Sequence, residues 1–195
     1  MIELVEHRLD DRHSFFVGAL PDALRFDAAA FDALWNQHPE DFHQIRMGGR
    51  LVKTPRWQQA YGADYHYTGR VNRALPMLDD LKPVHHWAQA EIDARLNGVL
   101  LNWYAPDRGH YIGRHRDSTV DMVRGSPIVT VSLGGARTFR LRKWRAEGVR
   151  DFVAADGVVF VLPYDTNLAW THEVPTSAKD VGRRISITLR AFHVR

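Results

Sequence analysis

His115 and Asp117, inside the run GHYIGRHRDS, carry the side chains whose spacing most directly suggests chemistry. A histidine and an aspartate two residues apart on an extended strand project from the same face of that strand. With a second histidine from a neighbouring strand, they would form a facial triad that binds Fe(II) and leaves coordination positions open. Since the sequence holds eleven histidines, such a pair also arises by chance, and its meaning depends on the residues around it.

His172, in the run LAWTHEV, is the candidate for the third ligand. This segment can form a late strand, and a fold with two sheets can bring it beside His115 despite the long sequence separation. The alternative is a hydrogen-bonded core histidine. The adjacent His85 and His86 cannot converge on one ion, because successive residues of a helix point about 100° apart.

Arg184 and Arg190 stand six residues apart in RRISITLR. An even spacing puts both on one face of a strand, with Ile185, Ile187 and Leu189 on the other. Inward-facing guanidinium groups need anions, and a dicarboxylate would satisfy them through paired hydrogen bonds. Six strand residues span about 20 Å, which exceeds the length of a small dicarboxylate. We therefore favour Arg184 as the direct contact, and the alternative for either arginine is a pair with an internal aspartate.

The expected elements are helices first and strands later. A helix is predicted over residues 28–35 with Asp27 as its cap, and a second follows Pro83, continues to Leu96 and stops at Gly98. Strands are predicted over residues 99–104, 128–133, 137–141, 158–162 and 185–189. This order indicates one α+β domain over residues 1–195, with N-terminal helices packed against a double-stranded β-helix (jelly-roll) barrel. We expect residues 1–98 to hold the helices and a recognition segment, and residues 99–195 the barrel core.

The composition is that of a soluble globular protein, with 45% hydrophobic and 25% charged residues. The absence of cysteine excludes disulfides and thiolate metal ligands. No apolar run is long enough to span a membrane, and the first residues do not form a secretory signal. We expect an intracellular, cytoplasmic protein that acts as a monomer.

Positive charge gathers in two segments, residues 46–73 and 137–150. The basic residues are Arg46, Arg50, Lys53, Arg56, Arg70 and Arg73 in the first, and Arg137, Arg140, Arg142, Lys143, Arg145 and Arg150 in the second. Each segment contains one acidic residue. Such segregation favours a surface that meets a polyanion such as nucleic acid, although a solvated basic surface explains it equally well.

From about Pro55 to Arg190 the chain resembles the AlkB family of Fe(II)/2-oxoglutarate-dependent dioxygenases, particularly its DNA-repair branch. The matching runs, in order, are PRWQQAYG, YHYTG, NWY, IGRHRD, GSPIVTVSLG, PYDTNLAWTH and the arginine pair. The resemblance implies Fe(II) ligation by His115, Asp117 and His172. It implies 2-oxoglutarate binding by Asn102, Tyr104, Arg184 and Arg190. The expected activity is oxidative demethylation of 1-methyladenine or 3-methylcytosine in DNA, which consumes O2 and releases formaldehyde, succinate and CO2.

For the substrate, the resemblance implies that Tyr67 and His115 sandwich the damaged base, while Arg56 and Tyr65 line the entrance. The alternative is that Tyr65 and Tyr67 only occupy one face of a packed strand. Ser118 and Thr119 depart from the acidic residues of the closest repair relatives, and Ser186 replaces a frequent asparagine. These departures leave the metal triad intact and the base preference open. An oxygenase of the same fold acting on RNA, protein or a small metabolite, and a barrel without turnover, are the alternatives.

Overall fold

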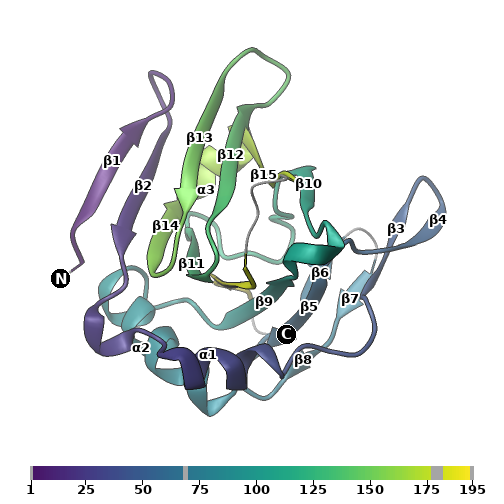
Figure 1. The fold of residues 1–195 in the computed structure, drawn as a ribbon. Helices are drawn as coiled ribbons and strands as arrows, with labels where there is room; N and C mark the ends of the chain where they lie inside the picture. Colours follow the sequence, from purple (N-terminus) through teal and green to yellow (C-terminus); the bar gives the residue numbers. More distant parts are fainter. Residues whose placement is uncertain (1, 68–69, 177–181, 194–195) are drawn as a thin grey trace.

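The protein folds into two β-sheets that face each other, with two helices covering the outer face of the larger sheet (Figure 1). The computed structural model describes residues 2–67, 70–176 and 182–193, without the side chains of residues 46, 47, 66, 67, 70 and 107. The helices are α1 (Ala28–Trp35), α2 (Lys82–Glu91) and α3 (Tyr164–Ala169). The strands are β1 (Leu4–Arg8), β2 (Ser14–Ala19), β3 (Gln44–Met47), β4 (Arg50–Lys53), β5 (Trp57–Tyr61), β6 (Tyr65–Tyr67), β7 (Arg70–Asn72), β8 (Ala74–Leu75), β9 (Gly98–Tyr104), β10 (Ile112–His115), β11 (Ile128–Gly134), β12 (Arg137–Lys143), β13 (Val149–Ala154), β14 (Val158–Leu162), β15 (Trp170–Val174) and β16 (Arg184–Arg190). This is the predicted α+β jelly-roll architecture.

The larger sheet has the strand order β1-β2-β14-β11-β16-β9-β5-β8, and the smaller has β10-β15-β12-β13. Strand β16 shows how the sequence positions the site, because its two faces have opposite character. Ile185, Ile187 and Leu189 pack into the apolar cluster shared with α1 and α2. Arg184 and Arg190, with the polar residues between them, line a cavity between the sheets. The alternation that the six-residue spacing predicts is therefore present.

The first helix matches its prediction, and the second ends early. Asp27 caps α1 by accepting a hydrogen bond from the Ala30 N–H at 2.8 Å. Helix α2 stops at Glu91, so its predicted continuation to Leu96 is wrong. The chain turns because the Asp93 carboxylate accepts from the Arg95 N–H. The Gln89 side chain then donates to the Leu96 carbonyl, satisfying it outside the helix.

The N-terminal half contains more strand than its helical signals predict. Strands β1 and β2 form a hairpin that joins the larger sheet through β14, and β5 pairs with β9 on the other side of β16. The division at residue 98 therefore does not separate helices from barrel. The hairpins β3–β4 and β6–β7 form two small sheets beside the barrel (Figure 1). Their edge position and short strands gave weak periodicity in the sequence.

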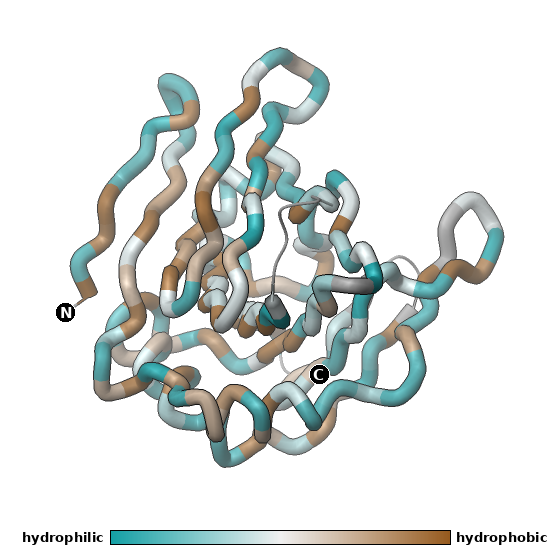
Figure 2. Tube along the Cα trace, viewed as in Figure 1, coloured by the Kyte–Doolittle hydropathy of each residue, from teal (hydrophilic) through white to brown (hydrophobic). Residues whose placement is uncertain are grey.

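The polar and apolar parts of the chain occupy different regions of the fold. The connections β1–β2 and β12–β13, at the top of the view, are mostly hydrophilic, whereas apolar segments concentrate on the strands and helices below (Figure 2). Two apolar clusters fill the space between the larger sheet and the helices and the space between the sheets. Within the described ranges, no helix has the length and apolar character needed to cross a membrane.

Candidate active site

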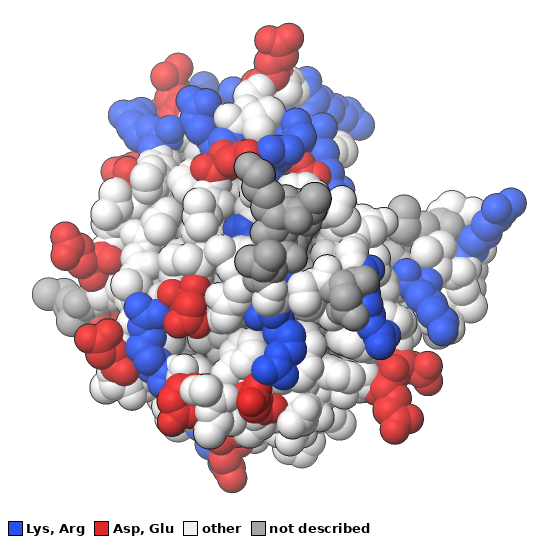
Figure 3. Space-filling model, viewed as in Figure 1, with Lys and Arg blue, Asp and Glu red and all other residues white. Residues whose placement is uncertain are grey.

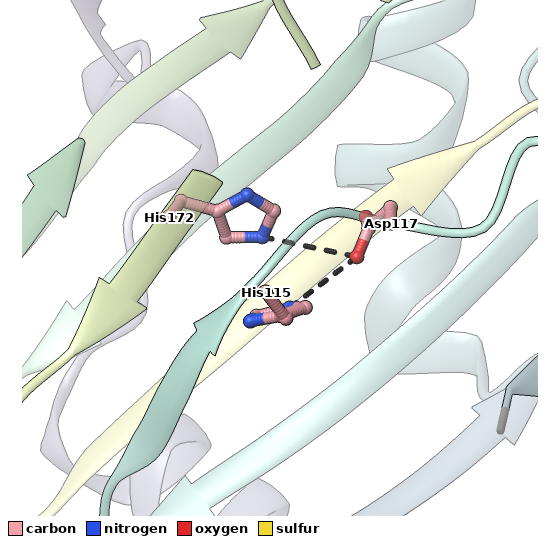
Figure 4. A group of neighbouring side chains, drawn as sticks. All are labelled: His115, Asp117 and His172. Atoms are coloured by element: carbon pink, nitrogen blue, oxygen red, sulfur yellow. Dashed lines mark ion pairs between the residues drawn. The ribbon is translucent and has the colours of Figure 1, made fainter. Parts of the chain in front are cut away.

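His115, Asp117 and His172 meet between the two sheets (Figure 4). His115 is the last residue of β10 and lies directly opposite His172 of β15. Asp117 lies two residues beyond the end of β10. The Asp117 Oδ1 atom lies 3.4 Å from His115 Nε2 and 3.7 Å from His172 Nε2. One ligand atom from each residue falls within 4.8 Å of the others. Strand β15 begins at Trp170, because Leu168 and Ala169 of the predicted strand complete α3.

The surroundings hold the two imidazoles in orientations suited to a metal. His115 Nδ1 lies 2.8 Å from the Gly113 carbonyl oxygen, which can only accept, so Nδ1 donates this hydrogen bond and Nε2 is the ring nitrogen turned toward Asp117. Burial, assisted by the neighbouring His115, lowers the pKa of His172 to about 3. His172 is therefore neutral at physiological pH, as a metal-ligating imidazole must be.

Asp117 is a buried carboxylate that remains ionised. Burial raises its pKa, but the Arg190 guanidinium and the two imidazoles outweigh burial and hold the pKa well below its usual range. Its backbone is fixed from α3, since Asn167 Oδ1 accepts from the Asp117 N–H at 3.0 Å and Asn167 Nδ2 donates to the Asp117 carbonyl at 3.1 Å. Two imidazoles and one carboxylate are a ligand set that fits Fe(II).

A cavity extends from the triad between the sheets and is lined by three guanidinium groups, those of Arg56, Arg184 and Arg190. Among its lining residues, Asp117 is the one carboxylate. Arg184, 1% exposed, donates from Nε to Ser132 Oγ at 3.0 Å, and its Cζ lies 4.9 Å from the centre of the Tyr104 ring. An excess of buried positive charge beside a metal site suits a dicarboxylate ligand.

Arg190 has a different arrangement from Arg184. Its Nε and Nη2 atoms lie 2.7 and 2.5 Å from Asp117 Oδ2, and its Cζ lies 4.7 Å from the centre of the Tyr65 ring. The alternative of a pair with an internal aspartate is what the structure shows for this arginine. Both arginines nevertheless line one cavity, so the strand between them forms a continuous wall.

Arg56 and Tyr65, which were expected to line the entrance, are buried inside the cavity. Arg56, 5% exposed, donates from Nε to Asn102 Oδ1 at 2.7 Å. Tyr65 is also buried, with its hydroxyl 3.4 Å from Asp117 Oδ1. Both are cavity walls and not an exposed rim. The side chain of Tyr67 lies outside the described part of the chain.

On its outer side, the triad borders a second hollow that the sequence did not single out. Its lining residues are Arg114, His115, Arg116, Asp117, Ser118, Thr119, Val120, Trp144, Asn167 and Leu168. Ser118 and Thr119, the two departures from the acidic pattern, therefore face this hollow beside His115. A tryptophan within the basic run RKWR was the signal in the sequence.

A jelly roll that holds two histidines, one aspartate and an arginine-lined cavity defines the class of Fe(II)- and 2-oxoglutarate-dependent dioxygenases. A family model described as the 2OG-Fe(II) oxygenase superfamily matches residues 27–190. The chain belongs to this superfamily, and its ALKBH2 relatives support its placement in the AlkB family. The cofactor and co-substrates of the class are Fe(II), 2-oxoglutarate and O2.

The chain is also similar to individual proteins of known name and to one solved structure. The chain is 28% identical over 158 residues to the DNA oxidative demethylase ALKBH2 of Bos taurus and to that of Homo sapiens. These matches cover 75% of this chain and 56% and 60% of the relatives, so the chain spans a little over half their length. It is 26% identical over 164 residues to an RNA replication protein of Grapevine virus A, covering 84% of this chain and 9% of that protein. The solved structure of OsALKBH1 superposes with a TM-score of 0.59 at 14% identity, covering 96% of this chain and all of the other, and supports the fold.

Proposed function

We propose that this protein removes N-methyl groups oxidatively from DNA bases of the 1-methyladenine and 3-methylcytosine type. The observation that carries the proposal is the convergence of His115, Asp117 and His172 beside the arginine-lined cavity. The relatives named as DNA oxidative demethylases support the substrate class. The overall change consumes one O2 and one 2-oxoglutarate and converts the N-methyl group into N–H and formaldehyde, with succinate and CO2 as the other products.

In this proposal His115, Asp117 and His172 would hold Fe(II), which would supply the activation of O2 needed to oxidise the methyl carbon. The Nε2 atoms of His115 and His172 and the ionised carboxylate of Asp117 would provide the three protein ligands. Arg184 binds a carboxylate of 2-oxoglutarate, with Asn102 and Tyr104 beside it on β9. Arg190 holds the Asp117 carboxylate in place through Oδ2, which leaves Oδ1 directed toward the histidines.

The test is turnover of a methylated DNA oligonucleotide with Fe(II), 2-oxoglutarate and ascorbate. We expect mass spectrometry to show loss of the methyl group, with succinate and formaldehyde formed in equal amounts. The unmethylated oligonucleotide is the matched control and sets the uncoupled consumption of 2-oxoglutarate. Steady consumption of 2-oxoglutarate without any change of the methylated DNA would remove the repair assignment and leave the oxygenase class intact.

RNA is the second candidate substrate, and the match to a viral RNA replication protein favours testing it. The cavity and triad do not distinguish the two sugars, since the described lining residues are those of the metal and dicarboxylate sites. A methylated RNA oligonucleotide of the same sequence, assayed in parallel, decides between them. Faster demethylation of the RNA would transfer the proposed activity to that substrate.

A further inference from the structure

The hollow on the outer side of the triad has the chemistry of a nucleotide-binding groove. Ser118 and Thr119 form part of its lining, and Trp144 and Arg116 stand beside them. His115 lines both this groove and the inner cavity. A strand whose modified base reaches the metal site at His115 would therefore continue directly into the groove.

Trp144 is the groove's exposed aromatic surface. It follows β12 and is 40% exposed, although its backbone N–H is anchored by a 2.9 Å hydrogen bond to the Ala169 carbonyl. The Cζ atoms of Arg116 and Arg145 lie 4.4 and 5.4 Å from the centre of its ring. An exposed indole with flanking guanidinium planes is a stacking surface for nucleobases, which bind both kinds of group through their π faces.

The two cations beside Trp144 differ from three cations of β12. Arg140, Arg142 and Lys143 are neutralised by Asp151, Glu173 and Asp10. Arg116 donates to the Leu168 carbonyl at 2.6 Å, and within the described residues neither Arg116 nor Arg145 forms an ion pair with a carboxylate.

Figure 3 shows Lys and Arg side chains gathered over β12 and β13, with acidic side chains among them. The acidic member of the connecting loop, Glu147, likewise forms no ion pair among those residues. The groove thus keeps positive charge available for a phosphate.

We propose that this groove binds the nucleotide next to the modified base, with its base stacked on Trp144 and its phosphate paired with Arg145. Arg145 is exposed on the loop between β12 and β13, so its guanidinium can move off the ring and donate hydrogen bonds to a phosphate. The subsite rests on the proposed function, because it assumes that the substrate is a nucleic-acid strand. It assigns a role to Trp144 and Arg145, which the metal and 2-oxoglutarate sites do not use.

The test measures binding of a short unmethylated single-stranded DNA by fluorescence anisotropy, which does not require turnover. We expect Trp144→Ala to weaken binding about tenfold, the size of one base–aromatic stack, and Trp144→Phe to restore most of that loss. Arg145→Gln should weaken binding and reduce its dependence on salt. Lys82→Gln, on the distant helix α2, removes the same charge and should leave binding within twofold of the wild type.

A kinetic measurement separates the subsite from the proposed function. With methylated DNA, Trp144→Ala should raise the KM for the oligonucleotide and leave the KM for 2-oxoglutarate unchanged. Equal DNA binding by the wild type and Trp144→Ala, or no binding by the wild type, would overturn the subsite even if demethylation occurs. Trp144-dependent binding without demethylation would support the subsite and refute the proposed reaction.

Discussion

The two sheets contribute to the site in different ways. Strands β9 and β16 of the larger sheet are buried along their whole length and carry Asn102, Tyr104 and Arg184. The smaller sheet carries His115 and His172, and its edge strand β13 exposes most of its residues. A strand packed on both faces has little freedom to move, so the proposed co-substrate residues stand on the more rigid wall. The two proposed histidine ligands stand on the smaller, more exposed sheet, which depends on contacts from other elements to hold it in place.

Asp117 is the point at which the two walls are tied together. It follows β10 of the smaller sheet, and its carboxylate pairs with Arg190 of β16 in the larger sheet. A change at Asp117 should therefore affect both sheets, whereas a change at Arg184 should affect the larger sheet alone. The difference between these responses tests whether the larger sheet serves the co-substrate and the smaller sheet serves the metal.

The largest effect is expected for Asp117→Ala. It removes a proposed metal ligand and leaves the Arg190 guanidinium buried without its carboxylate, which costs about 3–5 kcal/mol of stability. Mutating a residue that only hydrogen-bonds to a metal ligand typically lowers activity roughly 10–100-fold. Turnover should fall by more than that here, because Asp117 is itself a proposed ligand. Anaerobic titration with Fe(II) and 2-oxoglutarate should lose the visible charge-transfer band of the complex.

Asp117→Asn is the matched control for folding. It keeps the side-chain volume and one oxygen for Arg190, and should therefore fold better than the alanine variant while still losing iron affinity. Thermal unfolding with and without Fe(II) separates the two effects. Full turnover in either variant would show that Asp117 is not a ligand.

The inner face of the larger sheet was predictable because its signal is local. Even spacing alone places Arg184 and Arg190 on one face, and the apolar residues between them turn to the helices. The strands predicted over residues 99–104, 128–133, 137–141, 158–162 and 185–189 are confirmed for the same reason, whereas β13 was not predicted and the strand expected from Leu168 begins only at Trp170. The N-terminal strands β1 and β2 were missed, since their place in the sheet depends on pairing with β14, about 140 residues later. Pairing at that distance leaves no mark in a short window of sequence.

The site was predictable only in part. His115 and Asp117 follow from their spacing, but His172 was selected through the family resemblance, because a lone histidine on a strand is equally a core residue. The partner of Arg190 could be stated only as an alternative, since spacing does not say which of two arginines reaches an aspartate. The burial of Arg56 against Asn102 was not foreseen, because it depends on how β5 lies against β9.

Arg184→Gln should produce a smaller effect, confined to the co-substrate. A charge-assisted hydrogen bond contributes about 1.5–3 kcal/mol, so the KM for 2-oxoglutarate should rise roughly 10- to 150-fold. Iron affinity should stay near that of the wild type, because Arg184 contacts no member of the triad in the described structure. Arg190→Gln is the comparison, and it should weaken iron binding as well through Asp117. Equal loss of iron in both variants would contradict the assignment of separate roles.

The smallest effect should come from Asp10, which braces the smaller sheet from the β1–β2 turn. Its carboxylate accepts from the Trp170 indole N–H at 3.2 Å and pairs with Lys143 Nζ at 3.0 Å, which ties this turn to β15, two residues before His172, and to β12. Partial burial raises the pKa of Asp10, but its hydrogen bonds, first from the Arg12 N–H and then from Lys143, hold the pKa well below the usual value.

A carboxylate with a lowered folded-state pKa stabilises the fold above its unfolded pKa of about 4 and loses that contribution as the pH falls below it. Asp10→Asn should therefore lower the free energy of unfolding by about 1–2 kcal/mol at pH 7, and the gap to the wild type should narrow between pH 5 and pH 3. Urea unfolding across that range measures the gap, and Asp11→Asn in the same turn should change stability by less than about 0.5 kcal/mol. A gap that stays constant down to pH 3 would mean that the charge of Asp10 does not brace the sheet that holds His172.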